Sequence, residues 1–231
     1  MSRLARVVAP GLPHHITQRG NRRQQTFFCD EDYQSYLELM AEWCGAYEVE
    51  VWAYCLMPNH VHLIAVPHSA DGLRRAIGEV HRRYTRMVNF REGWRGHLWQ
   101  GRFASFVLDE PYLLTAVRYV ELNPVRAGLI NAPSRYPWSS AAAHVRGRDD
   151  ALVRVAPLAK LAPNWRGFLA RVIREEDIKA LRAHERTGRP LGEEEFVATL
   201  EQDLGRSLRR QKPGPKGKHP KRRTRTAKTP S

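Results

Sequence analysis

The stretch MPNHVHLIAV, from Met57 to Val66, places two histidines two residues apart inside an otherwise apolar run. On a β-strand, residues i and i+2 point to the same face, so His60 and His62 should project together. An apolar run favours burial, whereas an imidazole is costly to bury without a partner. Two imidazoles about 7 Å apart along a strand can converge on one metal ion. Isolated H-x-H pairs are common, however, so the pair alone does not identify a metal site.

The segments on either side of this stretch predict a mixed fold. Pro58 and Asn59 separate β-rich runs at 48–56 and 60–66, so the two runs should pair as a hairpin. A strand at 14–18 and a helix at 30–47 precede the hairpin, and a helix at 71–90 and a strand at 98–108 follow it. The order strand, helix, strand, strand, helix, strand predicts an α+β fold with a ferredoxin-like βαββαβ sheet.

One more helix should follow the last strand. Residues 109–111, Asp-Glu-Pro, can begin it, and it must end near Asn123 because Pro124 disfavours helical geometry in the residue before it. Tyr119 and Asn123 are four residues apart and share a helical face. The Asn123 amide oxygen could join two histidine nitrogens around a cation, which the helix C-terminus favours. At such positions, however, a tyrosine more often lies at the edge of the core, and an asparagine more often caps the end of a helix.

Composition points to a polyanionic partner. The 231-residue chain carries a formal net charge of +14 and is 42% hydrophobic, which is enough for a core. Such a charge indicates nucleic acid or an anionic membrane surface. No apolar run approaches the ~20 residues that a bilayer-crossing helix needs, and the N-terminus lacks the apolar stretch of a secretion signal. The odd number of cysteines, three, fits no disulfide framework, so we expect a cytoplasmic location.

Charge and patterning divide the chain into 1–145, which holds the predicted sheet, 146–207 and 208–231. Residues 146–207 should form a small helical region, with helices at 175–186 and 193–204 that fit either a helix-turn-helix or a plain helical hairpin. Glutamates at 193–195 would repel DNA phosphates, which weighs against the helix-turn-helix. Residues 208–231 hold ten Lys or Arg and no Asp or Glu, leaving 14 − 10 = +4 for the rest. They predict a disordered basic tail, either a solubiliser or a phosphate-binding arm.

Several motifs together resemble the single-tyrosine HUH transposases, and most closely the REP-associated tyrosine transposases. The HUH motif, two histidines flanking a hydrophobic residue, matches His60-Val61-His62. The tyrosine motif matches RYVELNPVRAGL, with Tyr119 in the nucleophile position and Asn123 where these families place a further polar metal ligand. HHITQRGNRRQ, HLWQGRFAS and YPWSS are similar too, so the resemblance covers about residues 10–145. RTGRPLG resembles the tail of longer members.

The resemblance implies an enzyme that cuts and joins single-stranded hairpin DNA. A divalent ion, Mg²⁺ or Mn²⁺, would be held by His60, His62 and Asn123 and would bind the scissile phosphate. The Tyr119 oxygen would attack that phosphate and form a covalent 5′-phosphotyrosine. Residues 1–145 would be the transposase domain. We expect no membrane partner and no small-molecule cofactor, and either a monomer or a homodimer.

Seven arginines are candidates for DNA contacts. Three lie in the RGNRRQ motif, three share one face of the helix predicted at 71–90, and one lies in HLWQGRFAS. They are Arg19, Arg22, Arg23, Arg75, Arg82, Arg86 and Arg102. For the three on the helix, an ordinary solvated face is an equally good interpretation.

Two other functions are compatible with the same residues. The first is a ferredoxin-like nucleic-acid-binding protein without catalysis, in which aromatic side chains on the sheet would stack on bases. The second is a metal-dependent hydrolase that activates water and leaves no covalent adduct.

Overall fold

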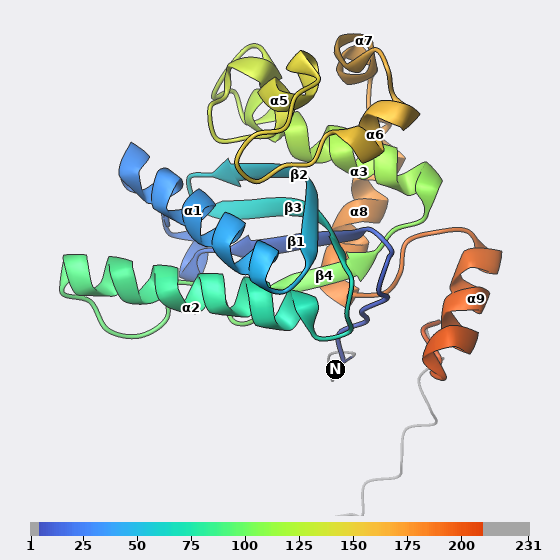
Figure 1. Ribbon diagram of the computed structural model, residues 1–231, viewed down its shortest axis with the longest axis horizontal. Helices are drawn as coiled ribbons and strands as arrows, with labels where there is room; N and C mark the ends of the chain where they lie inside the picture. The colour runs from blue at the N-terminus through green and yellow to red at the C-terminus, as the bar shows by residue number, and fades with distance from the viewer. Residues whose placement is uncertain (1–4, 210–231) are drawn as a thin grey trace, which may run out of the picture.

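The structure is a computed structural model that describes residues 5–209. Its centre is a four-stranded sheet of β1 (His14–Arg19), β2 (Val49–Met57), β3 (His60–Pro67) and β4 (Ala104–Val107). The strand order is β2-β3-β1-β4, with every neighbouring pair antiparallel (Figure 1). β3 lies between β1 and β2, and β1 lies between β3 and β4, so one strand splits each β-α-β unit. The predicted α+β class and the element order βαββαβ are confirmed.

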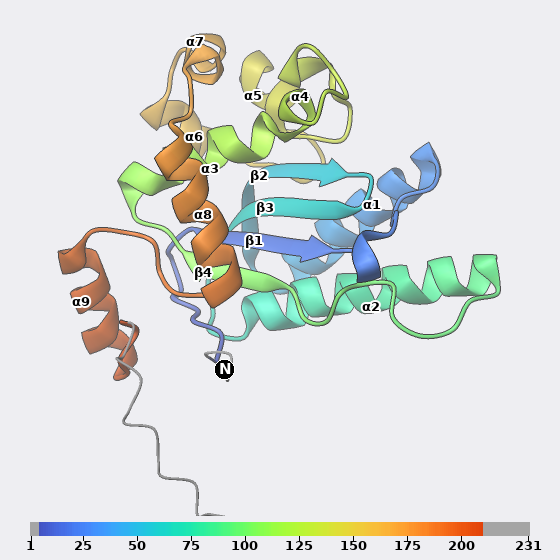
Figure 2. The ribbon, with the colours of Figure 1, turned by 180° about the vertical axis from the view of Figure 1, so that it is seen from behind.

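Helices cover both faces of this sheet. α1 (Asp30–Ala46) and α2 (Gly72–Glu92) pack on one face, and α3 (Glu110–Glu121) and α8 (Glu175–Thr187) lie on the other (Figures 1 and 2). Side-chain alternation along the strands produces this division. Ile16 and its partner Leu63 join the core beneath α1 and α2, whereas Ile64, the partner of His15, joins the core beneath α3.

The remaining elements are short, apart from α9. The predicted end of the tyrosine helix is close to the observed one, because α3 stops at Glu121 and Leu122 separates it from the next helical turn. No helix among residues 5–209 is long and apolar enough to cross a membrane. The other elements are η1 (Asn21–Arg23), α4 (Asn123–Arg126), η2 (Pro133–Arg135), α5 (Ala141–Arg146), α6 (Ala156–Leu161), α7 (Trp165–Ala170) and α9 (Glu194–Leu204).

The last strand is much shorter than the predicted 98–108. Only Ala104–Val107 forms β4, and residues 97–103 form a loop that crosses the end of β1. The Gln100 amide donates to Arg19 O at 2.8 Å, and Gly101 has a φ of 71°, which a regular strand does not accommodate. Leu98 and Trp99 are nevertheless buried. Leu98 and Trp99 are therefore apolar because they anchor this loop in the core.

The helices at 175–187 and 194–204 are present, but they bury their apolar residues in different places. Ile178 and Leu181 of α8 belong to the core beneath α3. Leu200 of α9 instead packs with the N-terminal residues Val7 and Ala9. Figure 2 shows the two helices apart, joined by an extended connection. They form neither the helix-turn-helix nor the helical hairpin, because each finds a better apolar partner elsewhere.

The basic tail predicted at 208–231 lies almost entirely outside the described residues. Its first two residues, Leu208 and Arg209, are described, and Leu208 is 1% exposed and packs with Val7 and Leu200. The Leu208 amide also donates to Glu201 Oε1 at 2.6 Å. The packed part of the chain therefore extends at least to Leu208.

A buried carboxylate fixes the C-terminal end of α3. Glu121 is fully buried and accepts hydrogen bonds from Ser140 Oγ at 2.6 Å and Trp165 Nε1 at 2.8 Å. Its Oε1 also lies 2.6 Å from His144 Nδ1. These partners come from residue 140, α5 and α7, so one side chain connects the tyrosine helix with the segments that follow it. A buried carboxylate with three partners is costly to disrupt, because its loss leaves their polar atoms unpaired.

We expect Glu121→Ala to lower the free energy of unfolding by about 3–5 kcal/mol, the usual cost of breaking a buried charged network. Urea unfolding followed by circular dichroism measures this change. Glu110→Ala is the matched control, because Glu110 is exposed at the other end of α3. A loss for Glu121→Ala that is no larger than for the control would contradict the role of this network.

Candidate active site

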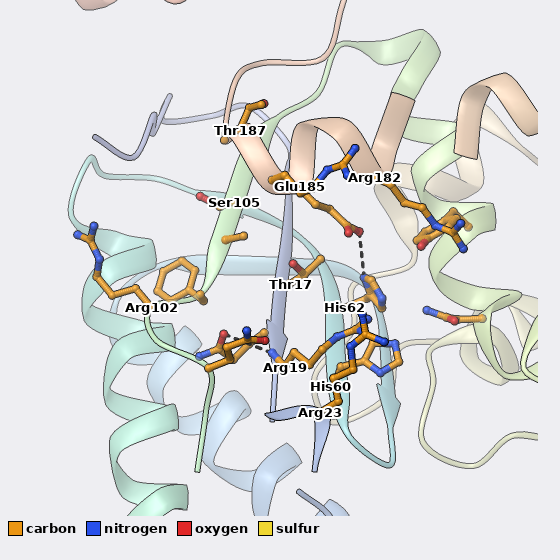
Figure 3. Close-up of a pocket in the computed structure, with 18 of the residues that line it drawn as sticks. Thr17, Arg19, Arg23, His60, His62, Arg102, Ser105, Arg182, Glu185 and Thr187 are labelled. Carbon is orange, nitrogen blue, oxygen red and sulfur yellow. Dashed lines mark hydrogen bonds and ion pairs between the residues drawn. The ribbon is translucent and has the colours of Figure 1, made fainter. Parts of the chain in front are cut away.

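A cavity of about 990 Å³ opens on the α3 and α8 side of the sheet. Its floor is formed by β1, β3 and β4, and its walls by the C-terminal ends of α3 and α8 together with α4 (Figures 2 and 3). Most of the site residues predicted from the sequence meet there. They are His60, His62, Tyr119, Asn123, Arg19, Arg23 and Arg102.

The two histidines of β3 both line this cavity, as the period of two along a strand predicts. His60 is paired in register with Arg19, and His62 with Thr17. His60 Nδ1 donates a hydrogen bond to Asn59 Oδ1 at 2.6 Å. In a neutral imidazole that donates from Nδ1, the Nε2 atom carries the lone pair that can bind a metal ion.

Burial keeps both imidazoles neutral. Burial, aided by the nearby positive charge of Arg19, lowers the pKa of His60 to about 4. The pKa of His62 is also well below its usual value, chiefly because of burial. A neutral ring is the form that coordinates metal, so neither histidine has to lose a proton at pH 7 before it binds a cation.

Tyr119 stands beside the histidines. Its ring centroid is 5.6 Å from that of His62, and its side chain is 5% exposed. The Arg126 guanidinium lies over the ring, 4.5 Å from its centroid. The nearby Tyr119 side chain is the largest cause of the raised pKa of Arg182. The tyrosine is therefore held between two cations, an environment suited to an anionic substrate.

Asn123 is placed one turn beyond Tyr119, at the start of α4. It lines the same cavity, and its Nδ2 atom is buried without a hydrogen-bond partner among the described residues. A buried amide N–H without a partner is uncommon in folded proteins, and it can donate a hydrogen bond to a substrate oxygen or a water. Tyr112, at the other end of α3, does not line the cavity; it packs on the core beneath α3.

Arginines give the cavity a strongly positive lining. Three of those predicted from the sequence are present, and four others were not anticipated. The seven are Arg6, Arg19, Arg23, Arg102, Arg126, Arg182 and Arg186. Guanidinium groups bind phosphate oxygens in a planar, bidentate geometry. The lining therefore matches a phosphodiester chain better than an uncharged ligand.

The other predicted arginines lie elsewhere. Arg22 is exposed outside the cavity. Arg75, Arg82 and Arg86 are on α2, which covers the opposite face of the sheet. Arg82 is engaged in an ion pair with Glu79 at 2.5 Å, and the Arg75 guanidinium lies 4.4 Å from the centroid of the Tyr47 ring. The structure does not bring these four arginines to the cavity.

The RGNRRQ motif forms a strained loop next to His60. Arg22 and Arg23 have φ values of 53° and 63°, a left-handed conformation that is uncommon for residues other than glycine. Hydrogen bonds hold the loop to the hairpin turn, from the Gly20 amide to Asn59 O at 2.8 Å and from Asn59 Nδ2 to Arg23 O at 3.0 Å. Strain of this kind persists where the surroundings impose it, often at functional sites. Here it aims Arg23 into the cavity.

Besides the four arginines, two possible metal-binding side chains next to His62 were not predicted from the sequence. His15 Nε2 is 3.0 Å from His62 Nδ1, and Glu185 Oε1 is 3.9 Å from the same nitrogen. His15 lies on β1 and Glu185 on α8. Burial raises the pKa of Glu185 to about 7, although several arginines oppose the shift. The alternation of His15, Thr17 and Arg19 along β1 could have revealed the histidine, whereas no local pattern marks Glu185.

The donors in the cavity fit a divalent cation. The histidines offer neutral imidazole nitrogens, Asn123 an amide oxygen and Glu185 a carboxylate. Mixed nitrogen and oxygen donors are compatible with Mn²⁺, and oxygen donors with Mg²⁺. Among the described residues, the group of His15, His62 and Glu185 brings three such ligand atoms within 4.8 Å of one another.

Comparison with known proteins finds relatives of the part of the chain that forms the sheet. Residues 10–123 match the family model described as Transposase IS200 like. A Haemophilus influenzae protein assigned as a REP-associated tyrosine transposase is 27% identical over 108 residues, which cover 42% of this chain and 61% of that protein. The chain therefore matches less than two thirds of the length of this curated relative.

A solved structure shows the same fold. It is the structure of a REP-associated tyrosine transposase bound to a REP hairpin, which matches with a TM-score of 0.55 and 24% sequence identity. The match covers 67% of this chain and 93% of the other. The resemblance predicted from the HUH and tyrosine motifs is thus confirmed, and residues 10–123 are those of an IS200-like transposase by this comparison.

Proposed function

We propose that the chain is a metal-dependent enzyme that nicks and joins single-stranded hairpin DNA through a covalent 5′-phosphotyrosine on Tyr119. The observation that carries this proposal is the meeting of Tyr119, Asn123 and two histidines in one arginine-lined cavity. A tyrosine beside ligand-type side chains has the components of nucleophilic catalysis on a phosphate. The match of residues 10–123 to the transposase family supports the same reaction class.

The Tyr119 oxygen attacks the scissile phosphorus. A bond forms between the tyrosine oxygen and phosphorus, and the bond from phosphorus to the 3′ oxygen breaks. The phenolic proton is lost, and the departing 3′ oxygen gains a proton. The energy of the phosphodiester is kept in the tyrosine ester, so a second 3′-hydroxyl can reverse the step and join strands.

The arginines of the cavity bind and orient the DNA backbone. Arg126 and Arg182 contact Tyr119 from α4 and α8, so they can bind the phosphate that the tyrosine attacks. Arg19 and Arg23 lie next to His60 and can hold the adjoining nucleotides. Fixed positive groups around the reacting phosphate stabilise the charge that develops in an in-line displacement.

A divalent ion, Mg²⁺ or Mn²⁺, would be held by His60, His62 and Asn123. When bound, it supplies Lewis-acid polarisation of the scissile phosphate. The lone-pair geometry of His60 supports this ligand set, and Asn123 lines the same cavity.

Single-stranded hairpin DNA is the proposed substrate. The REP-associated tyrosine transposase of known structure is bound to a REP hairpin. The positive lining of the cavity suits a polyanion. Because each chain has one tyrosine nucleophile, each chain can be linked covalently to one DNA strand. Because all the proposed catalytic groups come from one chain, a monomer can contain a complete site.

The experiment that tests this function is incubation of the full chain with labelled single-stranded hairpin DNA and Mn²⁺, followed by a denaturing gel. We expect a covalent protein–DNA band that disappears when the metal is removed with EDTA. Cleavage without a covalent band would favour a hydrolase that activates water. Binding without cleavage or adduct would favour a non-catalytic nucleic-acid-binding protein.

A separate prediction concerns the basic residues after Arg209. Deletion of 210–231 removes nine Lys or Arg, the ten of 208–231 less Arg209. We expect weaker hairpin binding with catalysis retained, because the deletion lies beyond the packed Leu208. For every phosphate that the shortened chain no longer binds, the slope of log K against log salt should fall by ~0.7. Fluorescence anisotropy at several salt concentrations measures this slope.

The control for the tail is a full-length variant in which the same nine basic residues are replaced by glutamine. If charge binds the phosphates, this variant should match the deletion. An unchanged salt slope in both variants would leave the tail as a solubilising segment only.

A further inference from the structure

Glu185 occupies an unusual position for a carboxylate. It extends from the last turn of α8 into the cavity and toward His62 (Figure 3). It is the only acidic side chain among the described residues that line this cavity, and seven arginines line the same cavity. The side chain is 21% exposed, so it is largely removed from solvent.

This carboxylate makes no ion pair with any of the surrounding arginines among residues 5–209. Among the described residues, the one basic side chain with a nitrogen within 4.0 Å of it is the neutral imidazole of His62, at 3.9 Å. Glu185 Oε1 is buried without a hydrogen-bond partner, and so is His15 Nδ1. A buried carboxylate oxygen without a partner costs several kcal/mol, so native structures pair such atoms with donors, waters or ions.

A cation held by Glu185 and the neighbouring histidines would satisfy this carboxylate oxygen. His15, His62 and Glu185 can each offer one ligand atom, and these atoms lie within 4.8 Å of one another. Two imidazoles and one carboxylate form a donor set that binds divalent metals and leaves positions open for substrate oxygens.

We infer that Glu185 is a ligand of the metal ion at the His62 site, so that α8 completes the site from outside residues 10–123. This inference rests on the proposed function, because it concerns the same ion. His15 is the neighbouring nitrogen donor of the cluster. The carboxylate also offsets part of the positive charge of the arginines, which would otherwise repel a cation from the cavity.

The packing of α8 on the sheet holds Glu185 at the cavity. Ile178 and Leu181 anchor it in the core beneath α3, and its C-terminal turn then reaches the cavity. The connection after α8 is fixed to β4, where the Leu191 amide donates to Val107 O at 2.9 Å. Both ends of the segment around Glu185 are therefore held, as a metal ligand requires.

The test measures Mn²⁺ binding to the full chain without DNA, by loss of the free Mn²⁺ signal in electron paramagnetic resonance. We expect Glu185→Gln to weaken Mn²⁺ binding by at least roughly 10–100-fold, the range that loss of a partner outside the ligand shell already produces. Glu176→Gln is the matched control, because Glu176 is exposed on the same helix. Unchanged Mn²⁺ affinity in Glu185→Gln would overturn the inference. Thermal unfolding of both variants shows whether the fold is retained.

A second variant separates a ligand from a residue that only orients His62. In Glu185→Cys loaded with Co²⁺, direct ligation should give a near-ultraviolet thiolate-to-cobalt charge-transfer band that is absent from Glu176→Cys. Absence of this band in Glu185→Cys, with Co²⁺ bound, would overturn the inference.

The same titrations separate failure of the inference from failure of the proposed function. If wild-type protein and His62→Ala bind Mn²⁺ equally poorly, the metal-dependent function itself fails. If His62→Ala loses Mn²⁺ while Glu185→Gln keeps it, only the assignment of Glu185 fails.

Discussion

Tyr119→Phe is expected to abolish the covalent protein–DNA adduct while leaving hairpin binding and Mn²⁺ binding close to wild type. Only the attacking oxygen is removed, and the ring still packs near His62 and beneath Arg126. Loss of a nucleophile that acts with its neighbours as a unit usually lowers the rate by at least about three orders of magnitude. A denaturing gel for the adduct and an anisotropy titration for binding measure the two effects separately.

Tyr112→Phe is the matched control for this prediction. Tyr112 lies on the same helix seven residues earlier, about 10 Å along its axis. It packs on the core beneath α3 and does not line the cavity. We expect this variant to form the adduct at a rate close to wild type. Mass spectrometry of the DNA-linked peptide gives an independent answer, and a nucleotide on Tyr112 or on neither tyrosine would refute the proposed nucleophile.

The fold could be predicted because its signals are local. The β-rich runs on either side of Pro58 and Asn59 mark β2 and β3, and an apolar stripe that includes Leu73, Ile77 and Tyr84 marks α2. The overlong prediction for β4 has a physical cause. Leu98 and Trp99 are as apolar as strand residues, but they anchor a loop that crosses the end of β1. Periodicity indicates burial, and burial alone does not distinguish a strand from an anchored loop.

The candidate site could be predicted only in part. His60 and His62 share a strand, and Tyr119 and Asn123 share a helical face, so spacing within one element places each pair together. Glu185 reaches the cavity through the packing of α8 on the sheet, more than a hundred residues after β3. No spacing rule connects such distant segments. The arginines of α2 show the converse, since their shared face is real but points away from the cavity.

His60→Ala and His62→Ala are each expected to reduce cleavage by roughly 10²–10⁴-fold, because loss of metal ligation removes several kcal/mol of transition-state stabilisation. The fold and most of the DNA binding should remain, since the seven arginines of the cavity are untouched. His62→Ala should weaken Mn²⁺ binding more strongly. His62 is 3% exposed and lies against both His15 and Glu185, whereas the His60 side chain hydrogen-bonds to Asn59.

His68→Ala is the matched control for these two variants. His68 directly follows β3, and its side chain is 50% exposed beside Glu50, away from the cavity. Its replacement should therefore change neither cleavage nor metal binding. Single-turnover cleavage of the hairpin at saturating Mn²⁺ ranks the four proteins. If His60→Ala or His62→Ala cleaves as fast as His68→Ala, the histidines are buried core residues, and the metal site has to be sought among the remaining donors of the cavity.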